Sequence, residues 1–295
     1  MGLSADPIQH SMGCADIGVV VHLRTGGMIL SLAATPAAGN PSMLTVETRT
    51  NPGPRATNED SVLWDPDLAL MAIADGMGGH NAGEVASRVA IDAAQEFLRK
   101  SALSPDITFA YGLNAALSMT ENRLLNAVKV ANRQIFSAGQ EHAEYNGMGT
   151  TVVMALVEGR HLTFASVGDS RLYSLVGSKL RQLTRDDSWV TMLSEETGVD
   201  AATLKKHPMH HVLTNVVGAR FELDVTVHEL DLEDGQTLMM CTDGLHGVIG
   251  DDAIQKTLQE EPDLGKAADR LIQAALDLNG RDNVTVLLAR YTNKK

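Results

Sequence analysis

Cysteine and positive charge are both scarce in this chain. Only two of its 295 residues are cysteines, Cys14 and Cys241, and they form no Cys-x-x-Cys pair. Neither a disulfide framework nor a thiolate zinc site is therefore expected, and the compartment is predicted to be reducing and cytoplasmic. Lys and Arg number 24 against 37 Asp and Glu, and the resulting net charge of −13 argues against a nucleic-acid partner.

Long hydrophobic runs are missing as well. The longest apolar stretches, around residues 17–23 and 28–34, are shorter than the roughly 20 residues that span a bilayer. Residues 1–17 contain no Lys or Arg, which a signal peptide would carry before its apolar run. We expect no transmembrane helix, no signal peptide and no membrane partner.

The N-terminal 42 residues differ in composition from the rest. Their only charged groups are Asp6, Asp16 and Arg24, and they show no sustained helical or strand period. Residues 1–42 are therefore predicted to be a poorly ordered appendage, and residues 43–295 a folded domain, with Met43 as an alternative start.

The sequence of residues 43–295 predicts strands and helices that occur in separate groups. Apolar stripes with helical spacing predict helices over residues 85–97, 113–140 and 264–276. Short β-branched or apolar runs predict strands over residues 68–74, 151–156, 161–167, 172–175, 222–230, 237–241 and 284–291. The runs within 151–175 have the spacing of an antiparallel meander. Segregated strands and helices indicate an α+β layered domain.

Four aspartates occur where apolar strands meet turns: Asp60, Asp75, Asp243 and Asp282. Each alone is typical of an ordinary turn residue. If the fold gathers them, their mutual repulsion requires cations. Carboxylates without Cys or His select Mg²⁺ or Mn²⁺, and two such ions can activate a water and hold a phosphoryl group.

Arg55 and Glu59 lie in the loop before Asp60. The Arg55 guanidinium is suited to two phosphate oxygens, although a solvated loop arginine is the commoner case. In an extended segment, Glu59 and Asp60 point to opposite faces, so only one of them can be a direct metal ligand.

The chain resembles the metal-dependent protein phosphatases of type 2C, the PPM family, in their compact bacterial form. The resemblance covers about Met43 to Tyr291. It consists of motifs in the family's order: RATNED, ADGMGGHNAGE, GMGTTVV, VGDSRLY, LTRDDSWV, HPMHHVLTNVVG, CTDGL and GRDNVTV. It implies a four-layer α-β-β-α sandwich, in which helices flank a central antiparallel β-sandwich.

The resemblance also implies a site and a reaction. Two Mg²⁺ or Mn²⁺ ions would be held by Asp60, Asp75, the Gly76 carbonyl, Asp243 and Asp282. Glu59 would contact a metal through water, and Arg55 would hold the phosphate. The family hydrolyses phosphoserine and phosphothreonine by direct attack of a metal-bridging hydroxide, without a phosphoenzyme, and the absence of a Gly-x-Ser-x-Gly motif agrees with this. The implied partners are phosphorylated Ser/Thr proteins and a cognate serine/threonine kinase, and the chain is expected to be a monomer.

Four positions depart from the family pattern. Met77 stands where many eukaryotic members have a histidine proposed as general acid, so we expect metal-bound water to deliver the proton. Asp187 replaces a common histidine, and Asn215 replaces an arginine of the flap segment. An Asp that helps hold a third metal is missing before GMGTT, and Glu144 is the candidate substitute.

Other motifs favour ordinary structural roles. GMGGHNAG lacks the spacing of a Rossmann or Walker loop. The histidines of HPMHH are interpreted as part of a polar loop, Cys241 as a core residue, and Asp169 as a turn residue that supports the site without binding metal.

Two alternative functions stay open at this stage. One is a catalytically silent relative that binds phosphoproteins or a kinase. The other is a metal hydrolase of small phosphate esters or nucleotides that uses the same site.

Overall fold

The computed structural model describes residues 44–79, 82–103, 109–204 and 207–293. The chain divides into two units, residues 1–41 and Ser42–Lys295. The predicted appendage over residues 1–42 lies outside the described residues. The second unit is described by itself below.

Two antiparallel sheets form the centre of this unit. One has the strand order β1-β11-β10-β7-β8, and the other has the order β2-β3-β5-β6-β9 with β4 paired to β3. The strands of the first sheet are β1 (Leu44–Asn51), β7 (Arg171–Val176), β8 (Lys179–Gln182), β10 (Thr237–Cys241) and β11 (Val284–Tyr291). Those of the second are β2 (Asp60–Asp65), β3 (Leu70–Met77), β4 (Gly149–Thr150), β5 (Val152–Glu158), β6 (His161–Val167) and β9 (Thr226–Asp231).

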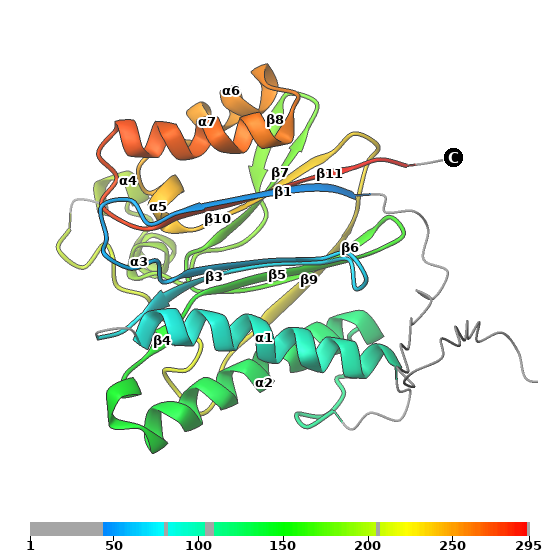
Figure 1. The fold of residues 1–295 in the computed structure, drawn as a ribbon, viewed down its shortest axis with the longest axis vertical. Coiled ribbons are helices and arrows are strands. Elements are labelled where there is room, and N and C mark those ends of the chain that lie inside the picture. Colours follow the sequence, from blue (N-terminus) through cyan, green and yellow to red (C-terminus); the bar gives the residue numbers. More distant parts are fainter. Residues whose placement is uncertain (1–43, 80–81, 104–108, 205–206, 294–295) are drawn as a thin grey trace, which may run out of the picture. The chain divides into compact units, whose positions relative to one another are not determined.

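Helices cover the outer face of each sheet (Figure 1). The long helices α1 (Ala82–Leu103) and α2 (Met119–Glu141) pack on the β2-to-β9 sheet, and α6 (Asp251–Glu260) and α7 (Leu264–Asp277) lie on the other. The shorter elements are η1 (Ala143–Tyr145), α3 (Trp189–Thr197), α4 (Ala201–Leu204) and α5 (Asp243–His246). The predicted four-layer α-β-β-α sandwich is confirmed. Among the described residues, none of the helices combines the length and apolar character needed to cross a bilayer.

The period-2 alternation of the strands explains the layers. On β3, Leu70 and Ala72 face the cluster under α1 and α2, whereas Met71 and Ile73 face the cluster between the sheets. β10 and β11 alternate in the same way toward α7 and the sheet interface. A strand that is buried on both faces has a continuous apolar sequence. This is why LALMAIA, which leads into β3, and TLMMC of β10 contain almost no polar residue.

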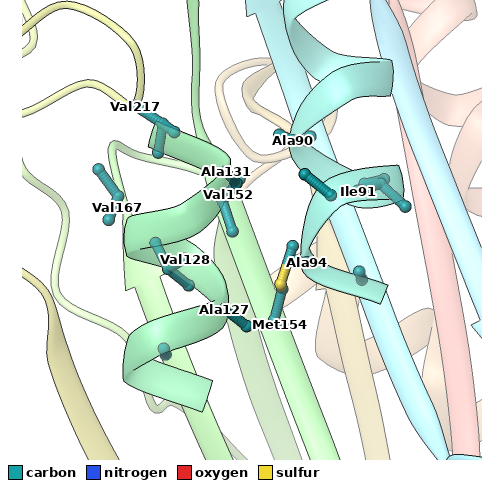
Figure 2. Close-up of a cluster of buried hydrophobic side chains, with 14 of the residues drawn as sticks. Ala90, Ile91, Ala94, Ala127, Val128, Ala131, Val152, Met154, Val167 and Val217 are labelled. Atoms are coloured by element: carbon teal, nitrogen blue, oxygen red, sulfur yellow. The ribbon is translucent and has the colours of Figure 1, made fainter. Parts of the chain in front are cut away.

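Small residues let α1 and α2 approach each other and the sheet. Figure 2 shows Ala90 and Ala94 of α1 beside Ala127 and Ala131 of α2, above Met154 of β5. All five side chains are fully buried. This cluster closes the layer between the two helices and the sheet that supports part of the site.

The start of α2 differs from the prediction. The helix was expected from residue 113, but it begins at Met119 after Ser118. Ser118 accepts a hydrogen bond from the backbone N–H of Glu121, and the Glu121 side chain accepts from the Ser118 N–H. This capping box stops the helix from extending toward the N-terminus.

The predicted meander over residues 151–175 is wrong at its last step. β5 and β6 pair, but β7 joins the other sheet, between β10 and β8. The chain changes sheets at Gly168, whose φ of 92° suits glycine, and at Asp169. The strand expected over residues 222–230 is also shorter, β9 starting at Thr226.

Candidate metal and phosphate site

A pocket of about 430 Å³ opens where the ends of both sheets meet. The β1–β2 loop, the end of β3, the β6–β7 turn, the start of α5 and the approach to β11 all contribute to its wall. The lining residues are Arg55, Glu59, Asp75, Gly76, Met77, Gly78, Thr151, Asp169, His211, Leu213, Val216, Asp243 and Asp282. Every predicted ligand except Asp60 therefore lines one pocket.

Strand register brings Asp60 next to Asp75. β2 and β3 are antiparallel, and Asp60 lies directly opposite Asp75. Opposed residues of an antiparallel pair share a face with their Cβ atoms about 5 Å apart, where two like charges are destabilising. The backbone of Asp75 is held by Thr150 and Thr151: its N–H donates to Thr151 Oγ1 at 3.0 Å, and Thr150 Oγ1 donates to its carbonyl at 2.8 Å.

Asp60 connects the two sheets. Its Oδ2 atom accepts hydrogen bonds from Thr242 Oγ1 at 3.0 Å and from Thr285 Oγ1 at 2.6 Å. Thr242 directly follows β10 and Thr285 lies in β11, both of the other sheet. The Oδ1 atom of Asp60 is buried and has no hydrogen-bond partner among the described residues, and the same is true of Asp243 Oδ1. Two buried carboxylate oxygens without a hydrogen-bond donor indicate that a group other than a protein side chain binds them.

Arg55 and Asp282 meet at the open side of the pocket. Arg55 donates to Asp282 Oδ2 and to the Arg281 carbonyl, both at 2.9 Å. Asn283 clamps the Arg55 loop, because its Nδ2 donates to the carbonyls of Pro52 and Thr57 and its Oδ1 accepts from the Glu59 N–H. Our sequence interpretation missed Asn283; the only signal for it was its position directly after Asp282.

Glycines let three backbone segments come together behind the pocket. A Cβ on Gly76 would lie 1.9 Å from the Gly83 carbonyl oxygen and 2.8 Å from that of Glu59. A Cβ on Gly83 would lie 2.6 Å from Glu59 Oε1. Gly76 and Gly83 of ADGMGGHNAGE therefore allow the close approach of β3, the start of α1 and Glu59.

Four aspartates in or behind the pocket have raised pKa values. Burial, followed by the charges of neighbouring carboxylates, raises the pKa of Asp75 well above its usual range and that of Asp243 above 3.8. Burial also raises the pKa of Asp60 and of Asp169 to about 7. Desolvation and mutual repulsion both penalise the ionised forms, and a bound cation relieves both.

The donor set fits hard divalent cations. All candidate ligands are oxygen atoms, they come from carboxylates and one carbonyl, and two of the oxygens are unpartnered. Within the described ranges, no group of three His, Cys, Asp or Glu side chains is already arranged around one point as a metal requires. Arg55 occupies one oxygen of Asp282, so cation binding at that oxygen requires these two side chains to separate.

The metal-free protein is expected to lose stability as the pH rises from about 4 to about 7. With pKa values of about 7 for Asp60 and Asp169, the folded protein retains protons that the unfolded chain has released in this window. Stability therefore falls with rising pH. In EDTA, the melting temperature should be higher near pH 5.5 than near pH 7.5, and Mn²⁺ should raise it most near pH 7.5.

The variant Asp169→Asn controls for this prediction, since it removes one of the two carboxyls whose pKa is raised to about 7. It should flatten the pH dependence in EDTA. A higher melting temperature of the metal-free wild type near pH 7.5 than near pH 5.5 would contradict the account.

Two pocket residues were given structural roles from sequence. Asp169, interpreted as a turn residue outside the ligand set, lines the pocket and faces the charge of Asp243. His211, interpreted as part of an ordinary polar loop, lines the pocket with Leu213 and Val216. The short turn between β6 and β7 brings Asp169 to the pocket, and the long segment between α4 and β9 brings His211 there.

Glu144, the candidate for a third metal, lies exposed in η1 and is not among the pocket-lining residues. Met77 lines the pocket and has no titratable group.

Asp187 and Asn215, the two departures in the flap region, contact each other: Asn215 Nδ2 donates to Asp187 Oδ2 at 3.0 Å. The two replacements thus form one interaction.

Cys241 is a buried free thiol, and burial raises its pKa. Its position agrees with the interpretation of Cys241 as a core residue.

The sequence model of Protein phosphatase 2C matches residues 55–287. Because this match covers most of the chain, the chain belongs to the protein phosphatase 2C family. The residues of the pocket lie within the matched range.

Curated relatives and solved structures agree with this family. Serine/threonine protein phosphatase PstP of Mycobacterium tuberculosis is 34% identical over 235 residues, which are 80% of this chain and 42% of that protein. Serine/threonine phosphatase stp of Listeria welshimeri is 32% identical over 221 residues, 74% of this chain and 83% of that protein. The chain spans less than half of the length of PstP.

The structure of the PstP catalytic domain in complex with 2 manganese ions has a TM-score of 0.70 at 33% identity. The comparison covers 84% of this chain and 98% of that one. The α+β sandwich of this chain is therefore the fold of that solved phosphatase.

Proposed function

We propose that this protein is a Mg²⁺- or Mn²⁺-dependent serine/threonine protein phosphatase. The observation that carries the proposal is the convergence of carboxylates from both sheets on one pocket, with an unpartnered buried oxygen on Asp60 and another on Asp243. Family membership and the two manganese ions of the PstP structure support it.

Each residue has a role that its position suits. Asp60, Asp75, the Gly76 carbonyl, Asp243 and Asp282 would hold two cations, and Glu59 would reach one through water. When bound, the two cations supply an activated water and neutralise charge on the phosphoryl group. Arg55 would turn from Asp282 to take two phosphate oxygens, which its exposed loop position permits.

The described pocket residues support direct hydrolysis. Thr151 is the only Ser, Thr or Cys among them, and its hydroxyl is buried between Ser170 Oγ and the Asp75 N–H. Cys241 faces the helices of the other layer. No hydroxyl or thiol of the described pocket is therefore placed to form a phosphoenzyme.

The partners proposed are phosphorylated Ser/Thr proteins and a cognate serine/threonine kinase. A monomer in the cytoplasm is the proposed state, supported by the low cysteine content and the buried, unpaired Cys241. Loss of Asp75, Asp243 or Asp282 would favour a catalytically silent relative, and all three are present.

Substrate class is tested by comparing a phosphothreonine peptide with a nucleoside monophosphate, each with Mn²⁺. The proposal expects the peptide to have the higher kcat/KM. A preference for the nucleotide would replace the protein phosphatase with a hydrolase of small esters. Binding of the phosphopeptide without phosphate release would indicate the silent relative.

A further inference from the structure

His211 is a pocket residue that the proposed two-metal chemistry does not use. It belongs to the loop between α4 and β9 and lines the same pocket as the carboxylates Asp75, Asp243 and Asp282. Its side chain is exposed to solvent. Histidine is the side chain whose ordinary pKa allows proton exchange near neutral pH.

The loop that carries His211 is fixed to the start of α3. Directly after His211, the Val212 carbonyl accepts from the Trp189 N–H at 2.8 Å, and Leu213 forms a β-bridge with Ser188. Before it, the His207 ring stacks on Trp189 with the ring centroids 4.5 Å apart. Trp189 thus anchors the loop on both sides of His211.

The other described lining side chains offer no suitable proton donor. Arg55 is not deprotonated in proteins, and Met77 has no titratable group. The Thr151 hydroxyl is engaged inside the protein. The carboxyls that bind cations must be ionised, and bound cations also favour the ionised form of the neighbouring Asp169 and Glu59. Among the described lining side chains, His211 is therefore the remaining donor, and it is the alternative to the metal-bound water that the sequence led us to expect in this role.

We propose that His211 donates the proton taken up by the leaving seryl or threonyl oxygen. The inference rests on the proposed function. A water oxygen forms the new bond to phosphorus, and the bond from phosphorus to the leaving oxygen breaks with its electron pair on that oxygen. The imidazolium N–H of His211 transfers its proton there, and the neutral ring is reprotonated from solvent.

This role makes a prediction about leaving groups. A seryl or threonyl oxyanion is a strong base and needs a proton to depart, whereas an aryl oxyanion departs without one. A general acid therefore accelerates hydrolysis of alkyl phosphates and contributes little to hydrolysis of an activated aryl phosphate.

The test compares His211→Asn with wild type, in Mn²⁺, on a phosphothreonine peptide and on p-nitrophenyl phosphate. We expect kcat on the peptide to fall by about 100-fold or more, and kcat on the aryl phosphate to stay within about threefold. Across aryl phosphates of rising leaving-group pKa, the rate of the variant should fall more steeply than that of wild type.

His210→Asn is the matched control. His210 lies in the same loop, its Nδ1 pairs with the His207 carbonyl at 2.8 Å, and it does not line the pocket. This variant should keep both activities, and circular dichroism should show both variants folded.

Equal losses on both substrates, a change in KM alone, or no loss in His211→Asn would each overturn the role of His211. Wild type is measured first. If wild type releases no phosphate from either substrate, both the proposed function and the role of His211 fail. If wild type is active and His211→Asn is equally active, only the role of His211 fails.

Discussion

Replacement of Asp75 by Asn is expected to lower phosphate release from a phosphothreonine peptide by a factor on the order of 10²–10³. Asp75 lines the pocket together with Asp243 and lies directly opposite Asp60, so we expect it to contact both proposed cations. The same substitution should stabilise the metal-free protein near pH 7.5 by about 1 kcal/mol, because it removes one of several buried like charges. Urea unfolding in EDTA measures the second effect.

Asp65→Asn is the matched control at the other end of the same strand pair. Asp65 is also a buried carboxylate, but its Oδ2 is held by Arg99 and by Gln95, each at 2.6 Å. Neutralising it should cost about 1.5–3 kcal/mol and leave turnover per folded molecule unchanged. If Asp75→Asn destabilised the metal-free protein as Asp65→Asn does, Asp75 would be a structural residue rather than a cation ligand.

Gly244→Ala is expected to destabilise the protein by about 3 kcal/mol. Gly244 follows Asp243 in α5, and a Cβ there would lie 1.9 Å from the carbonyl oxygen of Asn283. Either α5 or the segment before β11 must move, and each carries a predicted metal ligand. At about 2–4 °C per kcal/mol for a domain of this size, the melting temperature should fall by roughly 6–12 °C.

Gly250→Ala is the control for this steric argument. Gly250 precedes α6 with a φ of −76°, and a Cβ there would meet nothing within 4 Å. The change should cost no more than about 1 kcal/mol, the effect of alanine at a helix N-cap. Equal melting temperatures of the two variants would show that α5 and Asn283 are not packed as the structure has them.

The chemistry-bearing residues were predictable because they lie at strand ends. Asp75 follows an apolar run that is buried on both faces, and Asp243 follows a second such run. Both aspartates can therefore be recognised in the sequence as the polar residues at which an apolar run ends. Antiparallel pairing then brings Asp60 opposite Asp75. The layers were predictable for the same reason, since two-faced burial requires something to cover each side of the sheets.

Sheet membership was not predictable from local pattern. β7 follows β6 after only a Gly-Asp turn, and a meander and a crossover have the same spacing of apolar runs. The sheet that β7 joins is decided by its pairing with β10, which is far away in the sequence. The capping box at Ser118 did have a local signal, Ser followed three residues later by Glu121, and it would have corrected the start of α2.

His211, Asp169 and Asn283 could not be assigned to the pocket for a related reason. Each lies in a turn or loop whose path depends on distant contacts: His211 through Trp189, and Asn283 through the carbonyls of Pro52 and Thr57. A polar residue in a loop has no periodicity that reveals its direction. Only the assembled structure shows that these loops meet.

Phosphate release from a phosphothreonine peptide, measured with Mn²⁺, with EDTA, and with Asp243→Asn plus Mn²⁺, tests the central claim most directly. Asp243 supplies an unpartnered buried oxygen to the pocket, so the account predicts release that requires both the metal and this carboxylate. Release that persists in EDTA or in the variant would contradict a carboxylate-bound metal phosphatase, as would folded wild-type protein that releases no phosphate with Mn²⁺.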